Sequence, residues 1–236
     1  GFGYASKTFH APLIGGTPGM ALKAVASSDA DKVHADWPGV KVMSAPGDLL
    51  DDPDIDLVVI ATPNDTHFPL AKAALEAGKH VVVDKPFTVT LSQARELESL
   101  AKHCGRILSV FHNRRWDSDF LTVSALINEG QLGEVCYFES HFDRFRPQVR
   151  RRWREQAGPG SGIWYDLAPH LLDQVVVLFG LPVSITVDLA QLRPGAQSTD
   201  YFHAVLAYPQ RRVVLHGTLL AAAESARFIV HGSRAS

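Results

Sequence analysis

The stretch Asp56-Leu57-Val58-Val59-Ile60-Ala61 is an apolar run with the length and β-branched content of a strand covered on both faces. The turn Thr62-Pro63-Asn64-Asp65 follows it, and residues 68–77 then carry apolar side chains at helical spacing up to Gly78. A second short apolar run occupies 80–83. Strand, turn, helix and strand joined by short loops predict a parallel sheet with crossover helices.

This alternation extends in both directions along the chain. Residues 21–26 predict a strand upstream, 91–102 predict a helix that begins near Ser92, and 107–111 predict another strand. The first part of the chain is therefore expected to be a doubly wound α/β domain.

The pattern changes near His112. Three further apolar runs are separated by turns rich in Gly, Pro and Gln, which is typical of an antiparallel sheet with one solvated face: 185–192, 202–208 and 212–218. We expect a domain boundary near residue 112, with a doubly wound parallel-sheet domain over residues 1–112 and an α/β domain with an open, largely antiparallel sheet over residues 113–236. Since the chain opens abruptly on glycines and stops without a terminating element, we expect a longer protein that is truncated here at both ends, with the second domain incomplete.

Composition excludes several classes of partner. With 23 Lys and Arg against 25 Asp and Glu, the chain lacks the positive excess that usually holds nucleic acid or anionic membranes. No apolar run reaches the roughly eighteen residues that span a bilayer. Cys104 and Cys136 cannot build a disulfide framework, and no cysteine or histidine spacing predicts a metal site. We expect a cytoplasmic protein without metal that acts on a small molecule.

The first glycines resemble a dinucleotide fingerprint. In Gly1-x-Gly3-x-x-Ser6, glycine permits a tight turn and lets backbone N–H groups approach a pyrophosphate at a helix N-terminus. A glycine turn without a ligand is the alternative, and the strand, helix and strand pattern that follows favours the nucleotide. Tyr4 and Ala5, which lie between these positions, are included among the expected cofactor-binding residues.

The choice between NAD and NADP depends on the residues that follow the predicted strand over residues 21–26. Ser27 and Ser28 stand where an acidic residue would bind the ribose hydroxyls and repel a 2′-phosphate, and Lys32 is near. The sequence therefore favours NADP, with NAD left open.

Asp84-Lys85-Pro86 directly follows a buried strand, at the sheet edge where open α/β folds bind ligands. Lys85 would place a cation near a reacting centre and polarise a substrate oxygen. The alternative is a lysine that extends from a strand end into solvent.

Asp166-Leu167-Ala168-Pro169-His170 predicts the first turn of a helix that continues to Phe179. A spacing of four puts Asp166 and His170 on one side of that helix, where His170 is a candidate proton acceptor that the carboxylate orients. The alternatives are an N-cap role for Asp166 and a half-buried structural role for His170.

One basic run interrupts the second domain. It predicts either a loop that closes over an anionic or polyhydroxylated ligand or a solvated face, and its arginines are Arg144, Arg146, Arg150, Arg151, Arg152 and Arg154. No Tyr-x-x-x-Lys pair occurs, so the short-chain dehydrogenase arrangement is excluded.

Taken together, these elements resemble the glucose–fructose oxidoreductase and inositol dehydrogenase family (Gfo/Idh/MocA), and most closely its bacterial branch with NADP-dependent scyllo-inositol dehydrogenases. The matching segments are Gly1-x-Gly3, Lys7-Thr8-Phe9-His10-Ala11-Pro12-Leu13-Ile14, Ala61-Thr62-Pro63-Asn64-Asp65-Thr66-His67, Asp84-Lys85-Pro86 in place of the usual Glu-Lys-Pro, His112-Asn113-Arg114-Arg115-Trp116, Gly133-Glu134-Val135 and Trp164-Tyr165-Asp166-Leu167-Ala168-Pro169-His170. Family members begin with a strand before the first glycine and continue beyond Ser236.

The resemblance implies that residues 1–112 form a dinucleotide-binding Rossmann domain, a doubly wound parallel sheet. It also implies reversible oxidation of a secondary alcohol on a cyclic polyol or sugar. It implies Lys85, Asp166 and His170 as the catalytic group, and a homo-oligomer, dimer or tetramer, formed through the open sheet. The cofactor-binding residues expected from the motifs and the resemblance together are Gly1, Gly3, Tyr4, Ala5, Ser27, Ser28, Thr62, Pro63, Asn64, His67, Asp84 and Lys85, with Asn64 and His67 over the cofactor. Two other activities found in the family stay open: an NAD-dependent glycosidase and a regulator that binds the dinucleotide without turnover.

Overall fold

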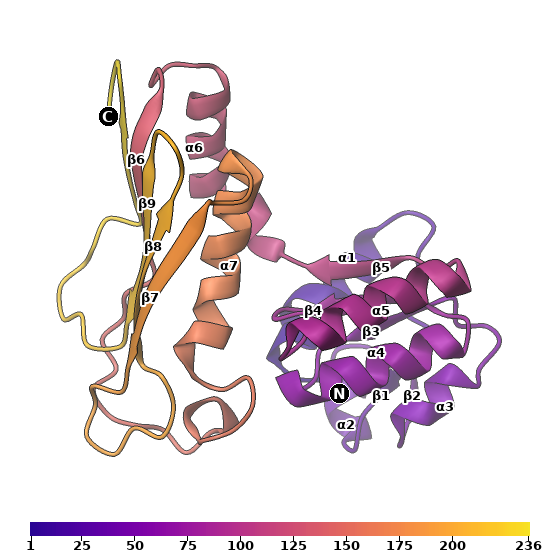
Figure 1. Cartoon of the computed structure of the whole chain (residues 1–236). Helices are drawn as coiled ribbons and strands as arrows, with labels where there is room; N and C mark the ends of the chain where they lie inside the picture. Colours follow the sequence, from indigo (N-terminus) through magenta and orange to yellow (C-terminus); the bar gives the residue numbers. More distant parts are fainter. The chain divides into compact units, whose positions relative to one another are not determined.

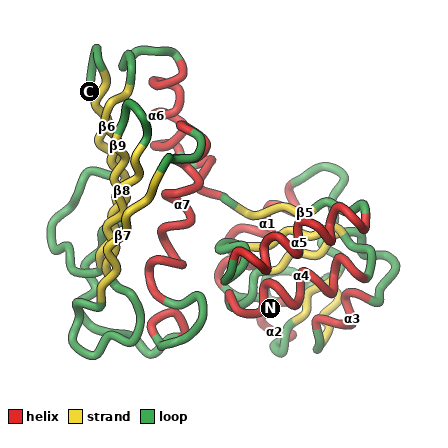
Figure 2. Tube along the Cα trace, viewed as in Figure 1, coloured by secondary structure: helices red, strands yellow, loops and turns green.

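The computed structural model describes residues 1–236, which divide into two compact units, Gly1–Phe111 and His112–Ser236 (Figure 1). Both units combine helices with strands (Figure 2). Each unit has its own hydrophobic core, and each is described by itself below.

The first unit alternates short helices and strands. In chain order they are the π-helical turn Ser6–His10, α1 (Ala11–Gly16), β1 (Ala24–Ala26), α2 (Ala30–His34), β2 (Lys41–Met43), α3 (Pro46–Leu50), β3 (Leu57–Ile60), the 3-10 turn Asn64–Thr66, α4 (His67–Glu76), β4 (His80–Asp84), α5 (Leu91–Cys104) and β5 (Leu108–Phe111). Every strand pair is parallel, as the apolar runs predict.

The parallel strands of the first unit lie in two sheets, β1-β2 and β3-β4-β5. A cavity of about 310 Å³ lies between β1 and β3, lined by residues 21–26 and 56–60. The larger sheet is covered by α4 and α5, whose Leu75 and Leu97 are fully buried with Val81 of β4. This burial explains why β4 is an apolar run rather than an alternating one.

Helix α5 starts at Leu91, as the predicted range 91–102 has it, but its expected N-cap is wrong. Its N-cap is Thr90 and not Ser92: the Thr90 hydroxyl accepts from the Gln93 N–H, and the Gln93 side chain accepts from the Thr90 N–H. This reciprocal pair satisfies two backbone donors, which a cap at Ser92 would leave open.

The second unit is a five-stranded mixed sheet with two long helices on one face (Figure 1). Its elements are the 3-10 turn Asn113–Trp116, α6 (Ser118–Asn128), β6 (Val135–His141), the 3-10 turn Trp153–Glu155, α7 (Gly162–Phe179), β7 (Ser184–Ala190), β8 (Tyr201–Ala207), β9 (Arg212–Thr218) and β10 (Phe228–Gly232). The strand order is β10-β6-β9-β8-β7, and only β6 and β9 pair in parallel.

Alternate residues of the sheet build the core of the second unit. In β8, Phe202, Ala204 and Leu206 are fully buried while the residues between them are partly exposed. Leu171 and Val175 of α7 pack against this face. The result is the one-sided sheet that the period of two predicts.

Helix α7 corrects one expectation. It begins at Gly162, four residues before Asp166, so Asp166 is not its N-cap and Pro169 lies inside the helix rather than in its first turn. Gly162 has φ +82°, and the N–H of the next residue, Ile163, donates to the carbonyl of Thr199 at 2.8 Å. A tertiary contact with a distant loop therefore sets the start of the helix, and the local sequence does not reveal it.

Candidate active site

The glycine turn leads straight into a helix. Helical residues begin at Tyr4, the N–H of Lys7 donates to the carbonyl of Gly3 at 2.9 Å, and the Ser6 hydroxyl donates to the carbonyl of Gly1 at 2.8 Å. A Cβ added at Gly1 or Gly3 would meet no atom within 4 Å. The space beside the turn is therefore open, and the turn residues fit the pyrophosphate of a dinucleotide at a helix start.

Ser27 and Ser28 follow β1 directly. The Ser27 hydroxyl bonds with the backbone of Asp29 in a tight turn at 3.1 Å, and Ser28 is exposed. The Asp29 carboxylate accepts from the N–H of Lys32 at 2.9 Å and caps α2. This strand end thus presents the exposed Ser28, while the Ser27 hydroxyl bonds within the turn and the Asp29 carboxylate caps α2.

The loops after β3 and β4 are tied together by His67. Its side chain is 1% exposed, with Nδ1 2.8 Å from the carbonyl of Pro86 and Nε2 3.0 Å from the carbonyl of Thr62. Asn64 is also buried. His67 therefore links the two loops structurally, and the expectation that Asn64 and His67 lie over the cofactor stays a prediction.

Lys85 lies one residue past β4. Its N–H donates to the Asp84 carboxylate at 2.9 Å, and both side chains are half-buried. The ring of His10, from the segment that resembles the family at residues 7–14, packs against that of Phe111 with centroids 4.2 Å apart. Burial lowers the pKa of His10, and the charge of Asp84 opposes that shift.

Asp166 and His170 occupy neighbouring turns on one side of α7, as their spacing predicts. His170 is buried, and its ring meets Phe142 edge-on with centroids 6.3 Å apart. The Asp166 carboxylate pairs with Nε of Arg154 at 3.4 Å, a partner that the sequence did not indicate. The candidate acid–base pair is thus bordered by an aromatic ring and a cation.

Two further cations lie against Phe142. The guanidinium of Arg227 is 3.9 Å from the ring centroid and that of Arg114 is 4.9 Å from it. Burial lowers the pKa of Arg227 to about 10. Gln174 of α7 links both arginines, accepting from Arg227 at 3.0 Å and donating to the carbonyl of Arg114 at 2.8 Å.

The expected catalytic group is divided between the two units: Lys85 belongs to the first, and Asp166 and His170 belong to the second. No three His, Cys, Asp or Glu side chains are grouped so as to hold a metal ion. No helix combines the length and apolar character required to cross a membrane.

Comparison with known proteins identifies the class. Residues 1–112 match the model "Oxidoreductase family, NAD-binding Rossmann fold", and residues 124–236 match "Oxidoreductase family, C-terminal alpha/beta domain". The chain therefore belongs to the Gfo/Idh/MocA oxidoreductase family, and the resemblance inferred from its motifs is confirmed.

Particular relatives match along the whole chain. It is 80% identical over all 236 residues to the uncharacterized oxidoreductase YdgJ of Escherichia coli K12, covering 68% of that protein. It is 37% identical, again over all of its residues, to the scyllo-inositol 2-dehydrogenase (NADP(+)) IolW of Bacillus subtilis, covering 66%. The structure of the YPO2259 oxidoreductase of Yersinia pestis superimposes with a TM-score of 0.92 at 70% identity, over 98% of this chain and 65% of that one. The chain thus spans about two thirds of these relatives' length.

Proposed function

We propose that the protein transfers a hydride reversibly between NADP(H) and a secondary alcohol of a cyclic polyol or sugar. The observation that carries this proposal is the open glycine turn at a helix start, in a family of nicotinamide-dependent oxidoreductases. The 37% identity to a scyllo-inositol dehydrogenase supports the polyol class.

The chemistry is assigned to three side chains. His170 takes the hydroxyl proton of the alcohol, and Asp166 and Phe142 hold its ring in place. Lys85 stabilises the negative charge that develops on the alcohol oxygen. When bound, the nicotinamide accepts the hydride from the same carbon.

The preference for NADP is assigned to the end of β1. Ser27, Ser28 and Lys32 offer hydroxyls and a cation to a 2′-phosphate, and the only carboxylate in that turn, Asp29, is already accepting a backbone N–H. The NADP(+) named for IolW supports the same assignment.

We also propose that the protein works in the cytoplasm as a homo-oligomer. The sheet face opposite α6 and α7 has no covering element within its own unit (Figure 1). Both cysteines are unpaired, which suits a reducing compartment. Sedimentation of the purified protein tests the assembly.

The proposed activity is tested by the absorbance of reduced nicotinamide with a panel of inositols and sugars, each with NADP⁺ and NAD⁺. We expect reduction with at least one cyclic polyol or sugar, and faster reduction with NADP⁺. Cleavage of a glycosidic bond without net reduction of the cofactor would instead favour the glycosidase, and cofactor binding without either reaction would favour the regulator.

A further inference from the structure

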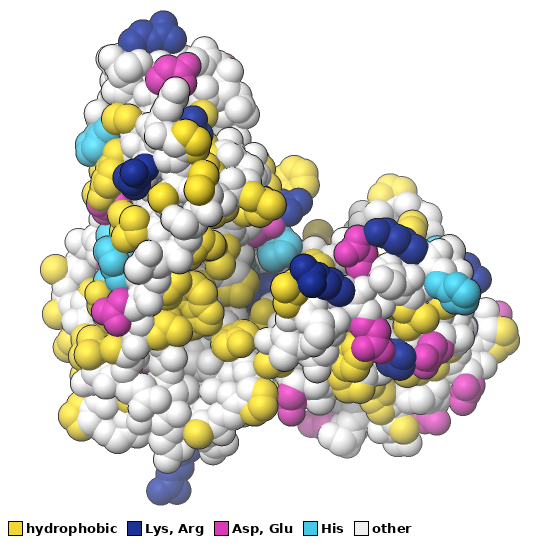
Figure 3. All heavy atoms as spheres, in the orientation of Figure 1, with side chains coloured by type: hydrophobic (Ala, Val, Ile, Leu, Met, Phe, Trp, Pro, Cys, Tyr) yellow, Lys and Arg dark blue, Asp and Glu magenta, His cyan; other side chains and the backbone are white.

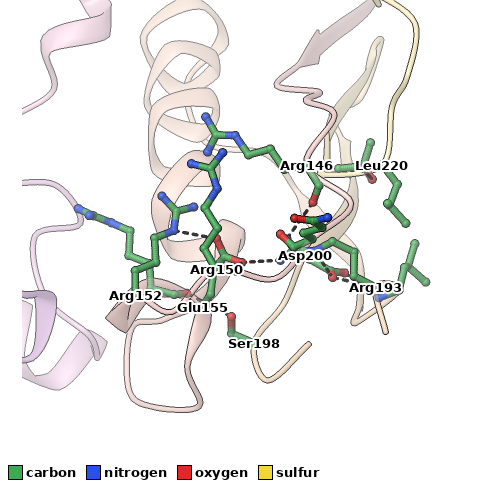
Figure 4. A network of polar contacts seen from close by, with 12 residues as sticks. Arg146, Arg150, Arg152, Glu155, Arg193, Ser198, Asp200 and Leu220 are labelled. Atoms are coloured by element: carbon green, nitrogen blue, oxygen red, sulfur yellow. Dashed lines mark hydrogen bonds and ion pairs between the residues drawn. The ribbon is translucent and has the colours of Figure 1, made fainter. Parts of the chain in front are cut away.

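The arginines of the second unit have two different roles, and one of these is to form a buried network of ion pairs. We call this network, made of Arg152, Glu155, Arg193 and Asp200, the ionic frame. Arg193 and Asp200 are both 2% exposed and pair at 2.9 Å, and Arg193 also pairs with the buried Glu155 at 3.1 Å (Figure 4). Glu155 in turn accepts from Nε of Arg152 at 2.7 Å. These two arginines are matched by carboxylates, so their role is to hold the loop together.

The same frame fixes the segment that carries the other arginines. Nη1 of Arg193 donates to the carbonyl oxygens of Arg146 at 3.0 Å and Gln148 at 3.2 Å. The N–H groups of Arg144 and Arg146 donate to the carbonyls of Thr218 and Leu219 at 2.9 and 2.7 Å. The backbone at 144–146 therefore continues beside the end of β9 and is held from both sides.

Arg144 and Arg146 lie on the side of this segment that faces α7. Side chains alternate along an extended chain, so both share the side of Phe142, whose ring contacts His170. The guanidinium groups of Arg146, Arg150 and Arg152 gather beside α7 (Figure 4).

No ion pair or hydrogen bond within 4 Å joins the guanidinium of Arg144 or Arg146 to an acceptor, although both residues are half-buried and the Asp166 carboxylate lies near enough to act on their pKa values. Burial lowers the pKa of both, their positive neighbours add to the shift, and only Asp166 and Glu155 oppose it. Two adjacent, partly desolvated guanidinium groups without acceptors are costly unless an anion joins them, and two parallel N–H donors match a carboxylate well.

We propose that Arg144 and Arg146 bind the carboxylate of an acidic sugar or polyol, so that the substrate class of this protein includes sugar acids. That the bound acid is a substrate rests on the proposed function, whereas binding of an anion at Arg144 and Arg146 does not depend on turnover. A phosphate group is the other source of the same chemistry, and the test separates the two.

The test compares sugars that differ only at one carbon. D-Glucuronate and D-galacturonate carry a carboxylate where D-glucose and D-galactose carry a hydroxymethyl group, and binding of each to the protein is measured by calorimetry with and without NADP⁺. We expect at least one acid to bind about tenfold or more tightly than its neutral partner, the scale of one charge-assisted pair. The double substitution Arg144→Gln with Arg146→Gln should remove this preference.

A matched control uses Arg151→Gln, an exposed arginine of the same loop, which should keep the preference. The double substitution Arg144→Lys with Arg146→Lys keeps the charge and loses the paired donors, so it should weaken the preference for acids without removing it. This variant keeps the proposal testable should the double glutamine variant not fold. Inorganic phosphate is titrated in parallel, and NADPH affinity is measured for every variant.

Equal binding of acids and neutral sugars would overturn the proposal, as would an acid preference that is undiminished in the double glutamine variant or, should that variant not fold, in the double lysine variant. Tighter binding of inorganic phosphate than of either acid, or loss of NADPH affinity in the variants, would assign the site to a phosphate group instead. If the acids bind as expected but no polyol or sugar reduces the cofactor, the proposed function fails while the anion site stands.

Discussion

Arg193 and Asp200 form an ion pair of 2.9 Å in which both side chains are 98% shielded from solvent. Asp200 also accepts the backbone N–H groups of Leu192 and Arg193 at 2.7 and 3.1 Å. The pair therefore holds the 191–200 loop to the arginine-bearing segment, since Arg193 reaches the carbonyls of Arg146 and Gln148.

Asp200→Ala should lower the free energy of unfolding by about 3 to 5 kcal/mol, because it leaves Arg193 buried with one fewer counter-charge. Urea denaturation measures the change. Asp188→Ala, an exposed carboxylate on β7, is the control and should change stability by less than about 0.5 kcal/mol. A small effect at Asp200 would mean that Glu155 alone compensates Arg193.

The pairings of this frame also show where sequence reasoning reaches its limit. The run Arg212–Thr218 was predicted with the bounds of β9, because a strand between two turns is encoded locally. Which arginine is structural and which is unmatched depends on Glu155 and Asp200, which lie far apart in the chain. No local pattern sorts Arg144 and Arg146 from Arg152 and Arg193.

Elements without strong periodicity were missed for a similar reason. The sequence does not predict helix α6 or strands β6 and β10. In β6 the buried residues are Val135, Phe138 and Ser140, and this spacing departs from the period of two by which a one-sided strand is recognised. The sequence predicts that α7 starts at Asp166 and not at Gly162, because an acidic residue before an apolar run resembles a cap. The Asp166 and His170 spacing was nevertheless correct, because a spacing of four depends only on the helix.

Gly162→Ala should destabilise the second unit by about 2 kcal/mol or more. An alanine there would adopt φ +82° and place its Cβ 2.9 Å from the backbone N and O of Thr199. Since Gly162 begins α7, we also expect the variant to lose turnover. Thermal unfolding checks the prediction, with Gly158→Ala as control because a Cβ at Gly158 meets nothing within 4 Å. Equal stability of the two variants would contradict the account of how α7 begins.

His216 should make stability depend on pH. Burial lowers its pKa, Asp143 and Glu139 oppose the shift, and His141 and His203 add to it. The unfolded chain therefore takes up the proton first as pH falls through about 6.5, so folding stability should fall between about pH 7 and 5, by at most about 1.4 kcal/mol per pH unit for one proton.

Urea denaturation across that range measures this slope. His216→Gln should reduce the slope. His10, whose pKa burial also lowers, adds a slope that this variant retains. An unchanged slope in His216→Gln would exclude this residue as the source.

Ser27→Asp should reverse the preference between the cofactors. The parent is expected to bind NADPH more tightly than NADH by about 1 to 3 kcal/mol, the scale of one or two charge-assisted hydrogen bonds. A carboxylate at this strand end would repel the 2′-phosphate and accept from the ribose hydroxyls. Calorimetry measures the affinity of the parent and of Ser27→Asp for NADPH and NADH. If the two affinities are equal in the parent and the substitution does not change them, the NADP preference assigned to this strand end is wrong.

His170→Ala should lower turnover by about 10² to 10⁴ with nearly constant cofactor affinity, because it removes a positioned proton acceptor. Lys85→Met should also depress turnover, since it removes the cation and keeps most of the side-chain volume. In the parent, oxidation should rise with pH as the proton acceptor loses its proton, and this limb should vanish in His170→Ala. If the limb persists there and vanishes in Lys85→Met, Lys85 is the proton acceptor.

The central claim, hydride transfer from a secondary alcohol to the nicotinamide, is tested most directly by isotope transfer. The protein is incubated with NADP⁺ and a polyol or sugar deuterated at its ring carbons, and the reduced cofactor is examined by mass spectrometry. The account predicts one deuterium on the reduced nicotinamide in the parent and little reduced cofactor in His170→Ala. Reduced cofactor without deuterium, or no reduction with any polyol, sugar or sugar acid tested, would contradict it.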